Sequence, residues 1–303
     1  MISSPSNKNV QELRALHALK GREAAGAFLI EGPHVLDAAL DAHVAPRLVL
    51  YDPTVLERTA QGRRTLGRIE EARARGVEAL EATGAAIDRA CDTRTPQGVV
   101  ASVALADVTA DKVRARRRGR ARPLLVVLDA VTDPGNLGTI LRSALAADAD
   151  EALVAPGCVD ALSPKVVRAG AGAHFYLPVR TGLNWEQITT WLYGAPSVRQ
   201  ILLAEAEGTR PYDSFDLTER TALVICNEAH GASAEAARLS KLRVSIPMWN
   251  KVESLNAAVA ASVILFEAAR QRRAHEADEA NTSDDTDGQD ADEQDADEQD
   301  ADE

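Results

Sequence analysis

The stretch LLVVLDAVTDPGNLGTILRSALAADADEALVA, residues 124–155, decides the fold class. Its first residues are apolar up to Asp129, which is typical of a strand buried on both faces. A Pro-Gly turn follows, and Asn136 is the predicted N-cap of a helix with one apolar face. The run EALVA then begins a second strand. A strand, a helix and a strand in this order indicate a parallel α/β sheet.

Further apolar segments extend this sheet, and a second set of elements precedes it. Continuous apolar strands separated by helices predict a parallel sheet covered on both faces. The strands are ILLAEA (201–206), TALVIC (221–226) and LRVSIP (242–247), followed by a helix from about residue 255 to residue 270. Before them, helices are predicted at 10–19, 33–42 and about 55–75, and strands at 28–30, 48–51 and 98–105. We therefore expect two α/β domains.

Charge is distributed unevenly along the chain. The net charge is −12 over 303 residues. Residues 274–303 hold fifteen acidic residues and no Lys or Arg, so the first 273 residues, with 34 basic and 31 acidic residues, carry +3. The folded part is thus mildly basic and suited to meet phosphates, whereas the tail repels them. Because the tail lacks large apolar residues, we predict that it is disordered.

A basic segment, KVRARRRGRARP at 112–123, separates the two predicted domains. It is interpreted either as a solvated connector or as an arm that contacts RNA phosphates. The predicted organisation is a first α/β domain at 1–106, a basic linker at 107–122, a second α/β domain at 123–273 and an acidic tail at 274–303.

Composition points to a protein of the cytoplasm. A share of 45% apolar residues suits packed cores, but no apolar run approaches the roughly 20 residues that span a bilayer. The start of the chain lacks the pattern of a signal peptide. Cys91, Cys158 and Cys226 are far apart and form no C-x-x-C pair. We expect reduced thiols, no metal site and no membrane contact.

Polar residues follow the predicted strands at positions where α/β proteins bind ligands. Asn227 and Glu228 come directly after the strand TALVIC, and Ser254 and Asn256 stand at the start of the last helix. Arg142 is the only cation on the helix after the first strand. Each segment by itself is equally explained by structure, namely helix caps, a turn and a surface charge.

Three motifs taken together are more specific. They are DPGNLGTILRSA at 133–144, VICNEAHG at 224–231 and SIPMWNKVESLNAAVA at 245–260. In type and order they resemble the motifs of the SpoU, or TrmH-like, branch of the SPOUT methyltransferases. The segments at 7–36 and 95–103 resemble the substrate-binding domain of that family.

The resemblance implies a fold, an activity and partners. It implies an α/β trefoil-knot (SPOUT) domain at the C-terminus, preceded by a ribosomal-protein-like α/β RNA-binding domain. It also implies a homodimer that transfers a methyl group from S-adenosyl-L-methionine to a ribose 2′-hydroxyl of RNA. Ribosomal RNA is preferred over transfer RNA, because an added N-terminal domain resembles the enzymes that act on ribosomal RNA.

The resemblance also assigns site residues. Backbone groups are expected to hold the cofactor at Ala204, Cys226, Ile246, Met248 and Leu255. The catalytic positions are Asn136, Arg142, Glu228, Ser254 and Asn256. Arg142 is expected to bind the hydroxyl and an adjacent phosphate, since a guanidinium that stays protonated is a poor base. The family usually has glycine where this chain has Cys226, and often near Asn250, so Cys226 is expected to narrow the cofactor pocket.

Two other classes of function remain. A noncatalytic RNA-binding relative is favoured only by the departures at Cys226 and Asn250. A dinucleotide-dependent enzyme of the Rossmann type is disfavoured, since no G-x-G-x-x-G follows the first strand of either domain.

Overall fold

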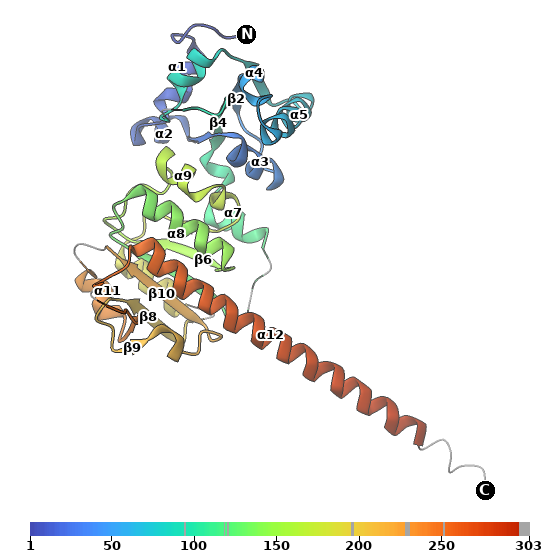
Figure 1. Ribbon diagram of the computed structural model, residues 1–303, viewed down its shortest axis with the longest axis vertical. Coiled ribbons are helices and arrows are strands. Elements are labelled where there is room, and N and C mark those ends of the chain that lie inside the picture. Colours follow the sequence, from blue (N-terminus) through green and yellow to red (C-terminus); the bar gives the residue numbers. More distant parts are fainter. Residues whose placement is uncertain are drawn as a thin grey trace.

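The computed structural model of the chain describes residues 1–93, 95–117, 119, 121–194, 197–227, 231–250 and 252–296, with side chains to residue 279. Two α/β domains lie one above the other, and the last helix extends far beyond the second domain (Figure 1). This arrangement has the fold class that the sequence predicts.

The N-terminal domain has a four-stranded sheet in the order β1-β4-β2-β3. Strand β4 is antiparallel to β1 and β2, and β3 is parallel to β2. Helices α3 and α5 pack on one face, and α1 and α6 on the other. The elements are α1 (Lys8–Ala15), α2 (Leu19–Ala25), β1 (Ala27–Glu31), α3 (Pro33–Asp41), β2 (Leu48–Tyr51), α4 (Pro53–Leu56), α5 (Ala60–Ala74), β3 (Glu78–Glu81), α6 (Gly84–Ala90), β4 (Val99–Ala104) and the 3-10 helix η1 (Leu105–Asp107).

The C-terminal domain has a seven-stranded sheet of parallel strands in the order β7-β6-β5-β10-β8-β11-β9. The central strands β5 and β10 are buried along their whole length. The elements are β5 (Leu124–Asp129), α8 (Pro134–Ala146), β6 (Glu151–Val154), α9 (Pro164–Gly170), η2 (Ala173–Phe175), β7 (Val179–Arg180), α10 (Trp185–Tyr193), β8 (Gln200–Ala204), β9 (Arg210–Pro211), η3 (Tyr212–Ser214), β10 (Thr221–Cys226), α11 (Ala234–Leu239), β11 (Leu242–Ser245) and α12 (Ala257–Ala296).

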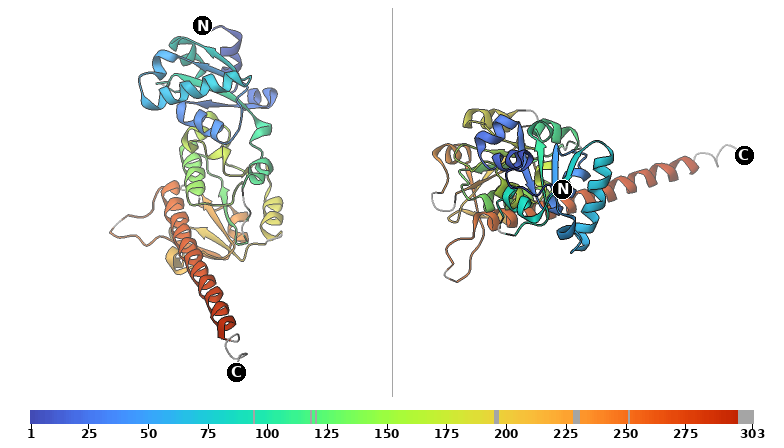
Figure 2. Two further views of the ribbon diagram at one scale, coloured as in Figure 1. Left: turned by 90° about the vertical axis from the view of Figure 1, so that its right-hand side faces the viewer. Right: turned by 90° about the horizontal axis from the view of Figure 1, so that it is seen from above.

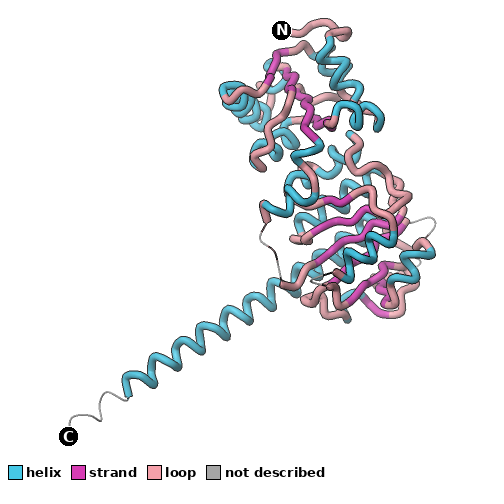
Figure 3. Tube along the Cα trace, turned by 180° about the vertical axis from the view of Figure 1, so that it is seen from behind, coloured by secondary structure: helices cyan, strands magenta, loops and turns pink. Residues whose placement is uncertain are grey.

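Helices cover both faces of this sheet, as Figure 3 shows for the magenta strands. Apolar side chains of α8, α9 and α12 form the core on one face, and those of α10 and α11 form the core on the other. Because the strands are parallel, the carboxyl ends of β8, β10 and β11 meet at one edge. Loops at such an edge are the usual ligand sites of α/β proteins.

Helix α8 begins earlier than its sequence suggests. The predicted N-cap at Asn136 is wrong: Asp133 caps the helix, and its Oδ1 accepts a hydrogen bond of 2.7 Å from the backbone N–H of Asn136. Pro134 takes the first helical position, where its fixed φ is favourable. Gly138 lies where α8 crosses α9, since a Cβ there would approach the Val166 carbonyl oxygen to 2.5 Å.

The basic segment between the domains contains helix α7 (Ala110–Ala115) and is bound to the C-terminal domain. Arg114 pairs with the fully buried Glu151. Arg117 donates to Asp148 at 2.7 Å and to the Tyr176 carbonyl at 3.2 Å. These arginines therefore have protein partners, which argues against a freely solvated connector or an RNA arm at these two positions.

Helix α12 is described to Ala296 and so extends into the acidic tail. The disorder of residues 274–303 stays a prediction. At the start of the tail, His275 and Glu279 contact Arg122. Among the described residues, no helix has the length and apolarity needed to cross a membrane.

The two domains share a packed junction. Val167 of α9 and Phe175 of η2 belong to the core of the N-terminal domain. The ring of Phe175 lies 6.3 Å from that of Phe28, measured between centroids. Charged pairs border these contacts, with Arg22 bonded to Asp160 and Arg168 donating to Glu31 at 3.2 Å. The junction thus fixes the orientation of the N-terminal domain on the sheet of the second domain.

Candidate functional site

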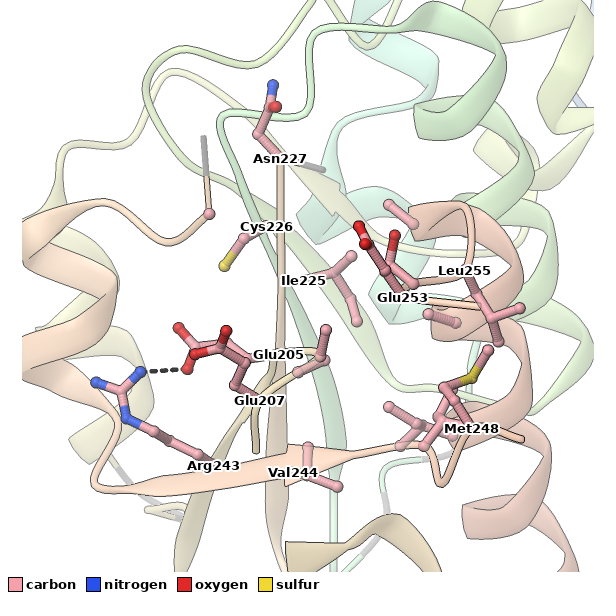
Figure 4. A pocket seen from close by; sticks show the side chains of 18 residues that line it. Glu205, Glu207, Ile225, Cys226, Asn227, Arg243, Val244, Met248, Glu253 and Leu255 are labelled. Atoms are coloured by element: carbon pink, nitrogen blue, oxygen red, sulfur yellow. Dashed lines mark hydrogen bonds and ion pairs between the residues drawn. The ribbon is translucent and has the colours of Figure 1, made fainter. Parts of the chain in front are cut away.

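A cavity of about 510 Å³ lies at the carboxyl ends of β8, β10 and β11. The segment that joins β11 to α12 closes it on one side (Figure 4). Its volume falls within the range typical of small-molecule sites. It is lined mainly by Ala204, Glu205, Glu207, Ile225, Cys226, Asn227, Arg243, Val244, Ile246, Met248, Glu253, Ser254 and Leu255.

All five predicted cofactor positions line this cavity. Ala204 ends β8, Cys226 ends β10, and the other three come from the segment before α12: Ile246, Met248 and Leu255. Strand ends leave backbone groups beyond the last ladder bond available to a ligand. The arrangement therefore suits recognition of a ligand by main-chain groups against apolar walls.

The polar part of the wall is predominantly acidic. Three carboxylates, those of Glu205, Glu207 and Glu253, line the cavity together with one guanidinium, that of Arg243. Arg243 is paired with Glu205, and both point into the same part of the cavity (Figure 4). A wall with this excess of negative charge favours a ligand that carries positive charge.

Two of the predicted catalytic residues are joined by a hydrogen bond, and a third lies two residues away along the chain. The amide of Asn256 donates to Oδ1 of Asn136 at 2.9 Å and so ties the start of α12 to the start of α8. Oδ1 of Asn256 accepts hydrogen bonds of 3.0 and 3.3 Å from the backbone N–H groups of Ala258 and Val259. Ser254, two residues before Asn256, lines the cavity.

Of the other two predicted catalytic residues, one lies in the part of the chain that the structure describes. Arg142 lies on α8, six residues after Asn136, and its side chain is exposed. It makes no hydrogen bond or ion pair with any residue in the described part of the chain and does not line the cavity. Glu228 lies outside the described residues.

Comparison with known proteins identifies the family of the chain. Residues 123–266 match the SpoU rRNA Methylase family, and residues 7–101 match the MRM3-like substrate binding domain. The 23S rRNA (guanosine(2553)-2′-O)-methyltransferase RlmP of Bacillus subtilis is 30% identical over 88% of this chain and 97% of its own length. The chain belongs to the SpoU family.

Other members of the SpoU family extend the comparison. The human mitochondrial rRNA methyltransferase 3 is 32% identical over 83% of this chain and 69% of its own length. The zebrafish mitochondrial rRNA methyltransferase 3A is also 32% identical, over 82% of this chain, and this chain spans 65% of the length of that relative. The SpoU methyltransferase AviRb from Streptomyces viridochromogenes has a TM-score of 0.74 and 31% identity over 89% of this chain and 99% of its own. An AdoMet-bound rRNA methyltransferase from Sinorhizobium meliloti has a TM-score of 0.73 and 29% identity over 89% of this chain and 97% of its own.

As a SpoU family member, the chain uses S-adenosylmethionine, and the cavity fits that cofactor. Apolar side chains such as Ile225 and Val244 suit an adenine ring, while the carboxylates suit the positive sulfonium and ammonium groups. Among the described residues of the wall, Arg243 is the cation that suits a carboxylate.

Cys226 stands at the position where the resemblance to the family implies glycine. Its side chain is 8% exposed and lies in the cavity wall. Burial, with a smaller effect from the Asp129 carboxylate, raises the pKa of the Cys226 thiol, so the group stays protonated. Asn250, the second departure, has a φ of 63°, a left-handed conformation that asparagine tolerates better than most residues.

The sequence interpretation missed the acidic part of this SpoU site. Glu205 and Glu207 follow directly on β8, and Arg243 lies within β11. The rule that polar groups at strand ends form ligand sites would have selected Glu205 and Glu207. Glu253 gave no such signal, because it lies in a loop whose path is not encoded by local pattern.

Proposed function

We propose that the chain methylates a ribose 2′-hydroxyl in ribosomal RNA. The observation that carries this proposal is the meeting of five predicted cofactor positions in one cavity, beside the linked pair Asn136 and Asn256. Mapping of 2′-O-methyl sites in total RNA from cells with and without the gene tests it. In cells without the gene, we expect one site in ribosomal RNA to lack its 2′-O-methyl group. If ribosomal RNA methylation is unchanged and a site in transfer RNA loses its methyl group, ribosomal RNA is not the target.

Ribosomal RNA is favoured by the N-terminal domain. That domain matches the MRM3-like substrate binding domain, and the curated relatives described above are named rRNA methyltransferases. The packed junction at Val167 and Phe175 holds the domain at a fixed distance from the cavity. A rigid spacing of this kind selects an RNA whose shape places the target ribose at the cavity while the first domain holds a second region.

The chemistry needs a positioned hydroxyl and a way to lose its proton. When bound, S-adenosylmethionine supplies an electrophilic methyl group on its sulfonium sulfur. We assign to Arg142 the binding of the ribose hydroxyl and an adjacent phosphate, which lowers the cost of the developing negative charge on the oxygen. Because the guanidinium stays protonated, the phosphate or water takes the proton. Asn136, Ser254 and Asn256 orient the target nucleotide.

Substitution of Arg142 tests this role. Arg142→Lys keeps the charge but loses the planar fork, so we expect kcat to fall about a hundredfold while S-adenosylmethionine binding, measured by calorimetry, is unchanged. Since Arg142 is exposed, thermal stability should change little. The matched control is Arg273→Lys, an exposed arginine on α12 that does not line the cavity. Near-normal turnover of Arg142→Lys would contradict the proposed role.

We also propose that the protein acts as a homodimer. The support is an apolar stripe on α12, where Val259 and Phe266 are each 49% exposed and Val263 lies between them on the same helical face. Exposed apolar residues at this spacing are typical of an interface. The cytoplasmic location stays a prediction, since the relatives are bacterial and mitochondrial proteins.

A further inference from the structure

Trp249 is the most exposed aromatic side chain among the described residues. It is 76% exposed and lies in the segment between β11 and α12, which projects from the body of the C-terminal domain (Figure 2). Tryptophan side chains usually bury most of their large apolar surface. No hydrogen bond, ring contact or cation contact joins Trp249 to another residue in the described part of the chain. Its position is therefore not explained by packing within one chain.

The chain places Trp249 directly beside residues that line the cofactor cavity. Its neighbour Met248 lines the cavity, and consecutive Cα atoms are about 3.8 Å apart. Glu253 and Ser254, a few residues later, line the same cavity. Asn250, with a φ of 63°, makes the chain turn directly after the tryptophan. Trp249 thus lies one residue from the cavity wall, in a segment that carries several of the lining residues, among them Ile246, Met248, Glu253 and Ser254.

The charges in the wall of the cavity determine which part of an RNA can lie beside Trp249. Among the wall residues that the structure describes, Glu205, Glu207 and Glu253 outnumber Arg243. A phosphate close to this wall would be repelled. A base, in contrast, is neutral and offers a flat face, and stacking of bases on aromatic side chains is the main way in which proteins hold unpaired RNA.

We propose that the indole of Trp249 is the platform on which a base next to the methylated ribose stacks. This inference rests on the proposed function, because it requires an RNA substrate at the cofactor cavity. It makes Trp249 a residue that positions the RNA and does not bind S-adenosylmethionine.

Three substitutions test the platform on ribosomal RNA from cells that lack the gene. We expect Trp249→Ala and Trp249→Leu to lower kcat/KM for RNA by about tenfold or more, and Trp249→Phe to stay within about threefold of wild type. S-adenosylmethionine affinity should be equal in all of them. The matched control is Tyr193→Ala, since Tyr193 is 57% exposed on α10 and does not line the cavity.

Fluorescence separates this inference from the proposed function. RNA should quench wild-type emission more than that of Trp249→Phe, in which Trp185 and Trp191 remain; this is expected even where no methyl group is transferred. Equal quenching in the two proteins, or unchanged kcat/KM in Trp249→Ala, would overturn the platform. A change in the mass of Trp249→Ala by sedimentation would also overturn it, because Trp249 would then belong to a subunit contact.

Discussion

At the scale of single residues, Cys226 offers a direct test of the cofactor cavity. Its side chain lies in the wall, and the expected contact with the cofactor uses its backbone. Cys226→Ala should therefore keep S-adenosylmethionine affinity within about threefold, whereas Cys226→Leu should weaken it at least tenfold by filling the cavity. Calorimetry measures both, and thermal unfolding checks that each variant folds. Wild-type affinity in the leucine variant would mean that the cofactor binds elsewhere.

The residue scale also shows what the sequence can and cannot predict. Ile246, Met248 and Leu255 were predicted by long motifs, and they reach the cavity because the strand before them ends there. Asn136 was predicted as a helix cap, but Asp133 has this role because Pro134 starts the helix. Arg142 lies on the helix that the sequence predicts. Its distance from a target ribose, however, depends on groups that no local sequence pattern describes.

At the scale of elements, η2 makes the stability of the domain junction depend on pH. Burial lowers the pKa of His174 from its usual 6.5 to about 4, because the charged imidazolium would lose its hydration; the hydrogen bond from Nε2–H to the Ala161 carbonyl has a smaller effect in the opposite direction. Nδ1 has no hydrogen-bond partner among the described residues. The unfolded chain takes up this proton below about pH 6.5, and the folded chain does not until about pH 4. Stability is therefore full above pH 6.5 and lost as the pH falls, by on the order of 3 kcal/mol at most.

A matched pair of variants tests this assignment. His174→Gln keeps a donor for the Ala161 carbonyl but has no titrating group, so its melting temperature should fall less than that of wild type between pH 7.5 and pH 5. His34→Gln, at an exposed position on α3, should follow wild type. The measurement is thermal unfolding by circular dichroism across this pH range. If the melting temperatures of His174→Gln and wild type fall equally between pH 7.5 and pH 5, groups other than His174 cause the loss of stability in acid.

Elements were predicted best where burial is complete. Strands β5 and β10 are buried throughout, and their apolar runs gave nearly their true bounds. Strand β3 was missed, because only its two middle residues are apolar and its two glutamates are exposed at the sheet edge. Strands β7 and β9 have two residues each, too few for any period. The acidic tail was assigned as disordered from its composition, and this assignment stays a prediction.

At the scale of the whole molecule, the packed junction between the two domains could not be predicted from the sequence. The basic segment indicated where one domain ends, and the structure has a short helix there. It did not indicate that Val167 and Phe175 complete the core of the other domain. Contacts of this kind join residues more than one hundred positions apart, and no local period reports them. The consequence is functional, because a fused junction sets the span between RNA binding and the cavity.

Assembly is the last property at this scale, and the apolar stripe on α12 makes it testable. Phe266→Glu places a charge in the proposed interface, where burying it without a partner is costly, so we expect the dimer to weaken at least a hundredfold. Sedimentation measures this. The matched control is Tyr193→Glu, an exposed aromatic away from α12. Because Phe266 is 49% exposed in one chain, the monomer should stay folded; a dimer of unchanged strength in Phe266→Glu would place the subunit contact on another face.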